Sequence, residues 1–217
     1  MNTPRHDIYA FIHKGLRAFM THTLVRVGRL DAHDPAECAE VGEELRALID
    51  ICRAHLQHEN EYVHPAMQVR APGSCEQVEA DHVHHEAALD ALAALLTRVP
   101  GNTDAAQALY RSLTRFVAEN FEHMALEECE HNAVLWAHYS DEEILAIEHA
   151  IVASQSPEDA QLSLRWMLPH MTPGERALML GGLRANAPAE AVEGVLSLIR
   201  PLLGGRDWRK LALALGL

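Results

Sequence analysis

Four long stretches of the sequence place apolar residues three and four positions apart, and short runs of glycine, proline and polar residues separate them. The stretches cover residues 7–29, 35–63, 74–98 and 104–137. Apolar residues at this spacing line one face of an α-helix, and no alternation of useful length predicts a strand. Long helices with short links pack as antiparallel neighbours. The sequence therefore predicts an all-α fold built on an up-down-up-down four-helix bundle.

Prolines mark expected helix boundaries along the chain. Pro35 suits the first turn of the second helix. His64 and Pro65 should begin the end of that helix, because the residue before a proline avoids the helical conformation. Towards the C-terminus the segments become shorter, with capping residues and first-turn prolines. We expect the bundle to occupy residues 1–139 and a C-terminal appendage of shorter helices to occupy residues 140–217.

The charge balance excludes several classes of protein. The chain has 31 acidic and 18 basic residues, a net charge of −13, and no basic cluster that would neutralise nucleic-acid phosphates.

No stretch of 18 apolar residues predicts a membrane helix, and the N-terminal residues lack the apolar core of a secretory signal. The 4 cysteines are scattered without a CxxC motif and are interpreted as free thiols. We expect a cytoplasmic protein that binds neither nucleic acid nor a membrane.

Histidine is the outlying residue type, with 15 in the chain, and it is a common metal ligand. In the second segment His55 precedes Glu59 by four residues, so both side chains share one helix face. The fourth segment repeats the arrangement with His123 and Glu127; Glu128, further round the helix, is the alternative carboxylate. Each pair is able to hold one ion or to span two neighbouring ions.

The other two helices each offer a histidine on the apolar face. In the third segment this residue is His82; Glu86 lies one turn further along, and His85 is the alternative to it. In the first segment it is His13, which has apolar neighbours at helical spacing. Seven of the other histidines are interpreted as surface, capping or loop residues: His6, His22, His33, His64, His138, His149 and His170.

Taken together, one inward histidine on each of four helices points to a metal centre. Four buried imidazoles need polar partners, and a metal would supply them all. Six or seven ligands suggest two ions, with Glu59 and Glu127 as the bridging carboxylates. Imidazole and carboxylate ligands without thiolate suit iron, manganese or zinc.

These residues resemble the hemerythrin-like family, which carries the HHE cation-binding domain. The resemblance covers residues 7–138, and it rests on Ile12-His13-Lys14, His55-x-x-x-Glu59-Asn-Glu-Tyr, His82 and His123-x-x-x-Glu127-Glu128. The appendage is similar to that of bacterial single-chain members with a C-terminal helical extension. The resemblance implies two iron ions with an oxo or hydroxo bridge, in preference to manganese or zinc. The expected ligands are His13, His55, Glu59, His82, Glu86, His123 and Glu127.

The resemblance further implies a protein that binds or senses O2, NO or peroxide, or iron itself, rather than an enzyme. Oxygen-carrying members have a His-x-x-x-His pair on the third helix, whereas here Glu86 follows His82. They also place the last carboxylate five residues after its histidine, at Glu128, whereas Glu127 matches iron-sensing members. The alternatives are a di-iron oxidase or peroxidase, an iron storage or iron–sulfur repair protein, and a helical interaction module without metal. The C-terminal helices could form a homodimer or bind a protein partner.

Overall fold

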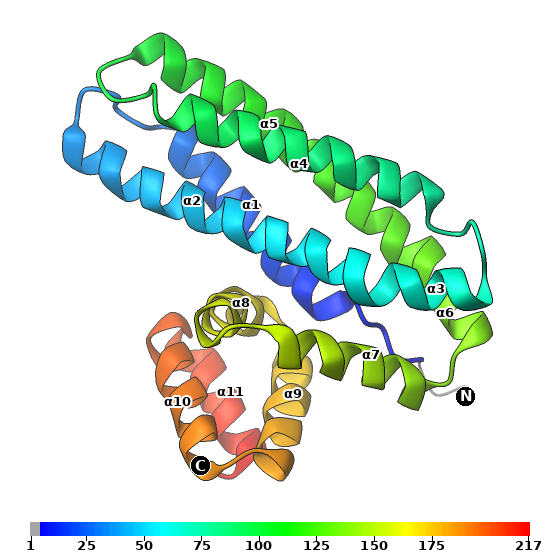
Figure 1. Ribbon diagram of the computed structural model, residues 1–217. Coiled ribbons are helices and arrows are strands. Elements are labelled where there is room, and N and C mark those ends of the chain that lie inside the picture. Colours follow the sequence, from blue (N-terminus) through cyan, green and yellow to red (C-terminus); the bar gives the residue numbers. More distant parts are fainter. Residues whose placement is uncertain (1–4) are drawn as a thin grey trace. The chain divides into compact units, whose positions relative to one another are not determined.

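The computed structural model describes residues 5–217, and within this range the chain is helical and has no strand. Four long helices lie side by side (Figure 1): α1 (Ala10–Gly28), α2 (Pro35–His58), α4 (Glu76–Leu96) and α5 (Thr103–Leu126). Successive helices run in opposite directions, so the predicted all-α, up-down-up-down bundle is confirmed. None of the helices in the described part of the chain is long and apolar enough to cross a membrane.

Local signals in the sequence set where these helices begin. The Asp34 side chain accepts hydrogen bonds from the backbone N–H groups of Ala36 and Glu37, and Pro35 occupies the first turn. Asn102 caps α5 in the same way. Along the bundle, large apolar side chains are almost fully buried. Among them are Phe19, Leu45, Leu48, Leu89, Leu92, Leu109, Leu113 and Phe116.

Two of the long helices, α2 and α5, continue through a π-helical turn into a further short α-helix. A π-helical turn, Glu59–Val63, joins α2 to α3 (His64–Arg70) without a break. The predicted end of the helix at His64 and Pro65 is therefore wrong. Proline interrupts an α-helix because it lacks an N–H and its ring meets the carbonyl one turn back. Here the wider π turn has already displaced that bonding, so the helix passes through the proline.

The fourth long helix has the same design. The π-helical turn Glu127–His131 follows α5 and leads into α6 (Asn132–His138). Both π turns begin at a glutamate that stands four residues after a histidine. Single π turns inside α-helices are rare and are frequent at functional sites. Their position points to the part of the bundle that holds the predicted ligands.

The described part of the chain consists of two compact units. The first contains residues 5–10 and 19–154, which include α7 (Asp141–Ser154). Ile144 of α7 is fully buried in an apolar cluster with Tyr9 and Leu135. The second unit contains residues 11–18 of α1 and residues 155–217. The domain boundary expected after residue 139 remains a prediction.

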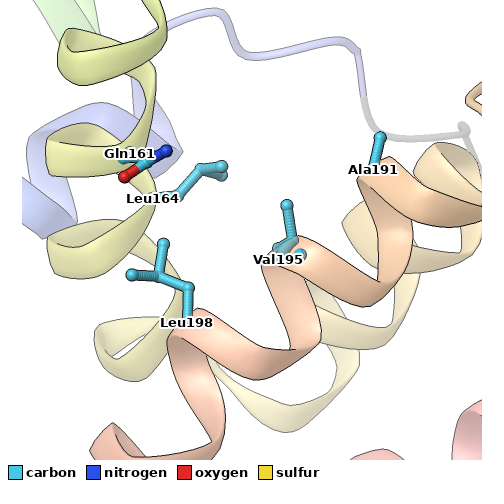
Figure 2. Close-up of a pocket in the computed structure, with 6 residues that line it drawn as sticks. Gln161, Leu164, Ala191, Val195 and Leu198 are labelled. Carbon is cyan, nitrogen blue, oxygen red and sulfur yellow. The ribbon is translucent and has the colours of Figure 1, made fainter.

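The second unit contains four further helices. They are α8 (Pro157–His170), α9 (Pro173–Asn186), α10 (Ala189–Ile199) and α11 (Gly205–Leu215), and a 3-10 turn, Arg200–Leu202, follows α10. Its core includes Leu168, Met171, Leu180, Ile199, Leu203 and Leu211. A hollow of about 470 Å³ between α8 and α10 is lined by Gln161, Leu164, Ala191, Gly194, Val195 and Leu198 (Figure 2). This lining is apolar apart from Gln161 and offers no set of metal ligands.

Arg176 on α9 holds the end of α8 in place. The side chain is only 2% exposed. Its guanidinium donates hydrogen bonds to the backbone oxygens of Leu168 (2.7 Å), Pro169 (3.2 Å) and Met171 (2.9 Å). The last carbonyls of a helix have no partner within the helix, so a buried helix end needs donors from elsewhere.

Replacement of Arg176 by methionine should therefore destabilise the second unit by about 2–4 kcal/mol, since it leaves buried carbonyls without donors. Urea unfolding followed by circular dichroism would measure the loss. Arg184→Met is the matched control, because Arg184 lies on the same helix but is exposed and donates to one carbonyl, that of Leu215. Equal stability of the two variants would contradict this role for Arg176.

Candidate metal centre

Four buried side chains from three helices converge near the two π turns. They are Glu59, His82, His123 and Glu127, and one donor atom of each lies within 4.8 Å of the others. His82 Nε2 is 3.2 Å from His123 Nε2 and 3.4 Å from a Glu59 oxygen, and His123 Nε2 is 3.4 Å from a Glu127 oxygen. Metal–ligand bonds are about 2.0–2.2 Å long, so ligands of one ion lie within about 4 Å of one another. The spacing suits a single cation.

A second group shares both carboxylates. His13 and His55 join Glu59 and Glu127, again with donor atoms within 4.8 Å of one another. His55 Nε2 is 3.2 Å from a Glu59 oxygen. The His13 side chain is fully buried, and that of His55 is 10% exposed. Two groups that share two carboxylates are the arrangement that a pair of bridged cations requires.

Burial of the two carboxylates dominates the electrostatics of the centre. Glu59 is 2% exposed and Glu127 is fully buried, within hydrogen-bonding reach of each other. Removal from water raises the pKa of Glu59 well above its usual value, and repulsion from Glu127 raises it further. Cations between them would remove both penalties, because a positive charge stabilises the ionised form.

Two of the histidines are oriented by hydrogen bonds on their far side. His82 Nδ1 is 2.8 Å from Asn60 Oδ1, and His123 Nδ1 is 3.4 Å from Asp81 Oδ2. In both rings Nε2 is the atom left to point into the centre. Burial opposes a charge on His123, but its contacts with Glu127 and Asp81 prevail and raise its pKa. Bonds of this kind fix the ring and increase the basicity of the ligating nitrogen.

Six of the seven predicted ligands thus lie in the two groups, and Glu86 does not. Its side chain is 48% exposed, and it lies 3.6 Å from the Arg53 guanidinium. The alternative, His85, is 2% exposed and packs edge-on against His123 with ring centroids 4.8 Å apart, yet it belongs to neither group. Glu128, the alternative to Glu127, also lies outside both groups.

The sequence analysis missed two histidines beside the centre. His64, interpreted there as a surface, capping or loop residue, is 2% exposed, so that interpretation is wrong; His131, 1% exposed, was assigned no role. Five residues of an ordinary α-helix rotate a side chain well off the face of the first one. A π turn takes up the extra residue, so His64 returns to the face of Glu59. Nothing in the apolar spacing reveals such a turn. His131, in contrast, stands four residues after Glu127, and this spacing is a signal that could have found it.

We predict that Glu59→Gln stabilises the metal-free protein at pH 8 and abolishes tight metal binding. The raised pKa means that Glu59 favours folding below its unfolded pKa, and that this contribution is lost as the pH rises towards the folded pKa. A neutral amide escapes this loss but is a poorer bridge between cations. Thermal melts of both metal-free proteins should show that the melting temperature of the Gln variant, relative to that of the wild type, is higher at pH 8 than at pH 5.

Glu61→Gln is the control, because Glu61 is exposed, accepts a hydrogen bond from Gln57 and belongs to neither group of donors. It should leave the melting temperature and the metal content unchanged. If the metal-free Glu59→Gln protein melts at a lower temperature than the wild type at pH 8, the buried Glu59 carboxylate does not destabilise the fold, and the prediction is wrong.

A second prediction concerns the bond behind His82. Asn60→Ala should weaken metal binding by about 10–100-fold, because the ring loses its orienting partner. Competition with a chelator of known affinity would measure the change. Gln57→Ala removes a comparable amide from the same helical stretch, one that donates to the exposed Glu61, and should bind metal like the wild type.

Comparison with known proteins agrees with this geometry. The family model described as the hemerythrin HHE cation binding domain matches residues 6–131, more than half of the chain and the segment that contains all the donors named above. Searches of curated proteins and of solved structures return no match.

Proposed function

Because the chain belongs to the hemerythrin HHE cation-binding domain family, we propose that it holds two iron ions and uses them to bind or sense a small ligand. One observation carries the proposal: two groups of four donors each share Glu59 and Glu127. In this assignment His13 and His55 are the terminal ligands of one ion, and His82 and His123 are those of the other. A single ion would leave one pair of imidazoles without a role.

The nature of the donors supports iron. Nitrogen from imidazole and oxygen from carboxylate suit iron, manganese and zinc, and in the two groups no thiolate takes part. Zinc has no redox chemistry, whereas a centre that responds to O2, NO or peroxide needs a metal that exchanges electrons. When bound, iron would supply that chemistry, and manganese is the second choice.

The surroundings of the donors support a small ligand. None of the side chains in the two groups is more than about a tenth exposed. A centre so enclosed suits a diatomic molecule or peroxide and excludes larger substrates. The protein's own part is to exclude water and to hold the imidazoles, as Asn60 does for His82 and Asp81 for His123. These features favour binding or sensing over turnover of a bulky substrate.

Metal analysis of the purified protein, together with its absorption spectrum, tests the proposal. We expect two irons per chain and charge-transfer absorption in the near ultraviolet, both lost in His123→Ala. His84→Ala is the matched control: His84 lies on α4, is exposed and pairs with Glu119. One zinc per chain, or no metal after iron loading, would overturn the assignment.

The ligand is tested on the reduced, iron-loaded protein. Spectral changes that saturate with O2, NO or peroxide would identify what is bound. A response to iron concentration alone would instead assign iron sensing. Multiple turnover of peroxide, lost in His123→Ala, would favour the alternative of a di-iron peroxidase.

A further inference from the structure

We propose a third cation position beside the dinuclear centre, formed by His64, Glu127 and His131. It extends the proposed function, on which it rests, because Glu127 belongs to both sites. The donor atoms of the three residues lie within 4.8 Å of one another. Neither histidine belongs to the two groups described above. The position therefore adds a site instead of completing an existing one.

Unsatisfied nitrogen atoms indicate that something should bind here. His64 is 2% exposed, and neither of its ring nitrogens has a hydrogen-bond partner among residues 5–217. His131 is 1% exposed, and its Nε2 is in the same condition. A buried polar atom without a partner is unfavourable, because it has lost its hydrogen bonds to water. Three such atoms in one place are hard to explain as packing, and one cation would satisfy a nitrogen of each ring.

The chain also aims His131 at this position. Tyr9, itself 2% exposed, has its hydroxyl 3.2 Å from His131 Nδ1. That bond occupies the far nitrogen and leaves Nε2 for the cation, as Asn60 leaves Nε2 of His82. The rings of His64 and His131 stand nearly perpendicular, at 89°, with centroids 5.5 Å apart. They approach the position from different directions, as ligands of a tetrahedral ion do.

Each glutamate that begins a π turn has a histidine of this position close behind it on the same helix. His64 directly follows the turn Glu59–Val63, and His131 is the last residue of the turn Glu127–His131. His64 stands five residues after Glu59, so the π turn is needed to return it to the face of that glutamate. His131 stands four residues after Glu127 and shares its face by ordinary helical spacing.

Ligand type defines the class of cation. Two imidazoles and one carboxylate suit divalent iron, cobalt or zinc, and leave a fourth coordination position open. Magnesium and calcium prefer oxygen ligands and do not fit. Because the Glu127 charge is shared with the dinuclear ions, attraction for the third cation is weaker and the neighbouring cations repel it. The third ion should therefore bind last and leave first.

Titration of the metal-free protein with Co²⁺, followed by visible absorption, tests the proposal. Wild type should saturate at three equivalents per chain, one for each group of donors, with the last bound more weakly. The double variant His64→Gln, His131→Gln should saturate at two and keep the two tighter equivalents. His138→Gln, an exposed histidine on α6, is the control and should retain three. Circular dichroism would establish that each variant is folded.

The outcomes separate this proposal from the proposed function. Wild type that saturates at two equivalents, or a folded double variant that still takes three, would overturn the third position alone. Saturation at one equivalent or none would overturn the dinuclear centre and the third position with it.

A second measurement does not depend on the variants. Anomalous scattering from wild-type crystals saturated with Co²⁺ should show a peak between His64 Nε2 or Nδ1 and His131 Nε2. Peaks at the two other groups without one at this position would overturn the proposal.

Discussion

Glu59 and Glu127 face each other inside the bundle, where water reaches neither to any extent. Two like charges at this depth are unfavourable, as the raised pKa of Glu59 reflects. The side chains around the two carboxylates are arranged to hold cations beside them. Imidazoles approach the pair from several helices, and amide and carboxylate groups hold those rings from behind. The apolar packing of the long helices keeps the carboxylates from moving apart. The buried pair destabilises the metal-free protein, and cations bound between the two carboxylates would offset that effect.

The π turns give the centre its detail. In a regular α-helix, residues four apart share one face, so each histidine and the glutamate four residues after it point to the same side of the helix. At Glu59–Val63 the widened turn returns His64 to that face, and after Glu127 ordinary spacing places His131 there. Both turns also start at one of the two carboxylates that the groups of donors share. The two further histidines therefore lie against these groups.

The C-terminal helices are held together by different interactions. The second unit has its own apolar core and its own buried polar anchor, Arg176, which satisfies carbonyls at the end of α8. Its hollow between α8 and α10 has an apolar lining and no metal ligands. The partners expected for this region, a second copy or another protein, remain proposals. The metal chemistry belongs to the family domain at residues 6–131.

By itself, the sequence determined the helical class, the antiparallel order of the bundle and the two His-x-x-x-Glu pairs, because these depend on spacing within single helices. His13 and His82 followed from the same periodicity. Only the tertiary structure decided the third-helix position, where Glu86 turns to Arg53 and His85 packs against His123. It also placed His64 and His131 inside, and it carried a helix through Pro65. The position of His64 and the passage through Pro65 depend on the π turn Glu59–Val63, which shifts the helical phase by one residue, and no pattern of apolar residues records that shift. His131 lies four residues after Glu127, and only the packing of the helices decided that this part of the helix is buried.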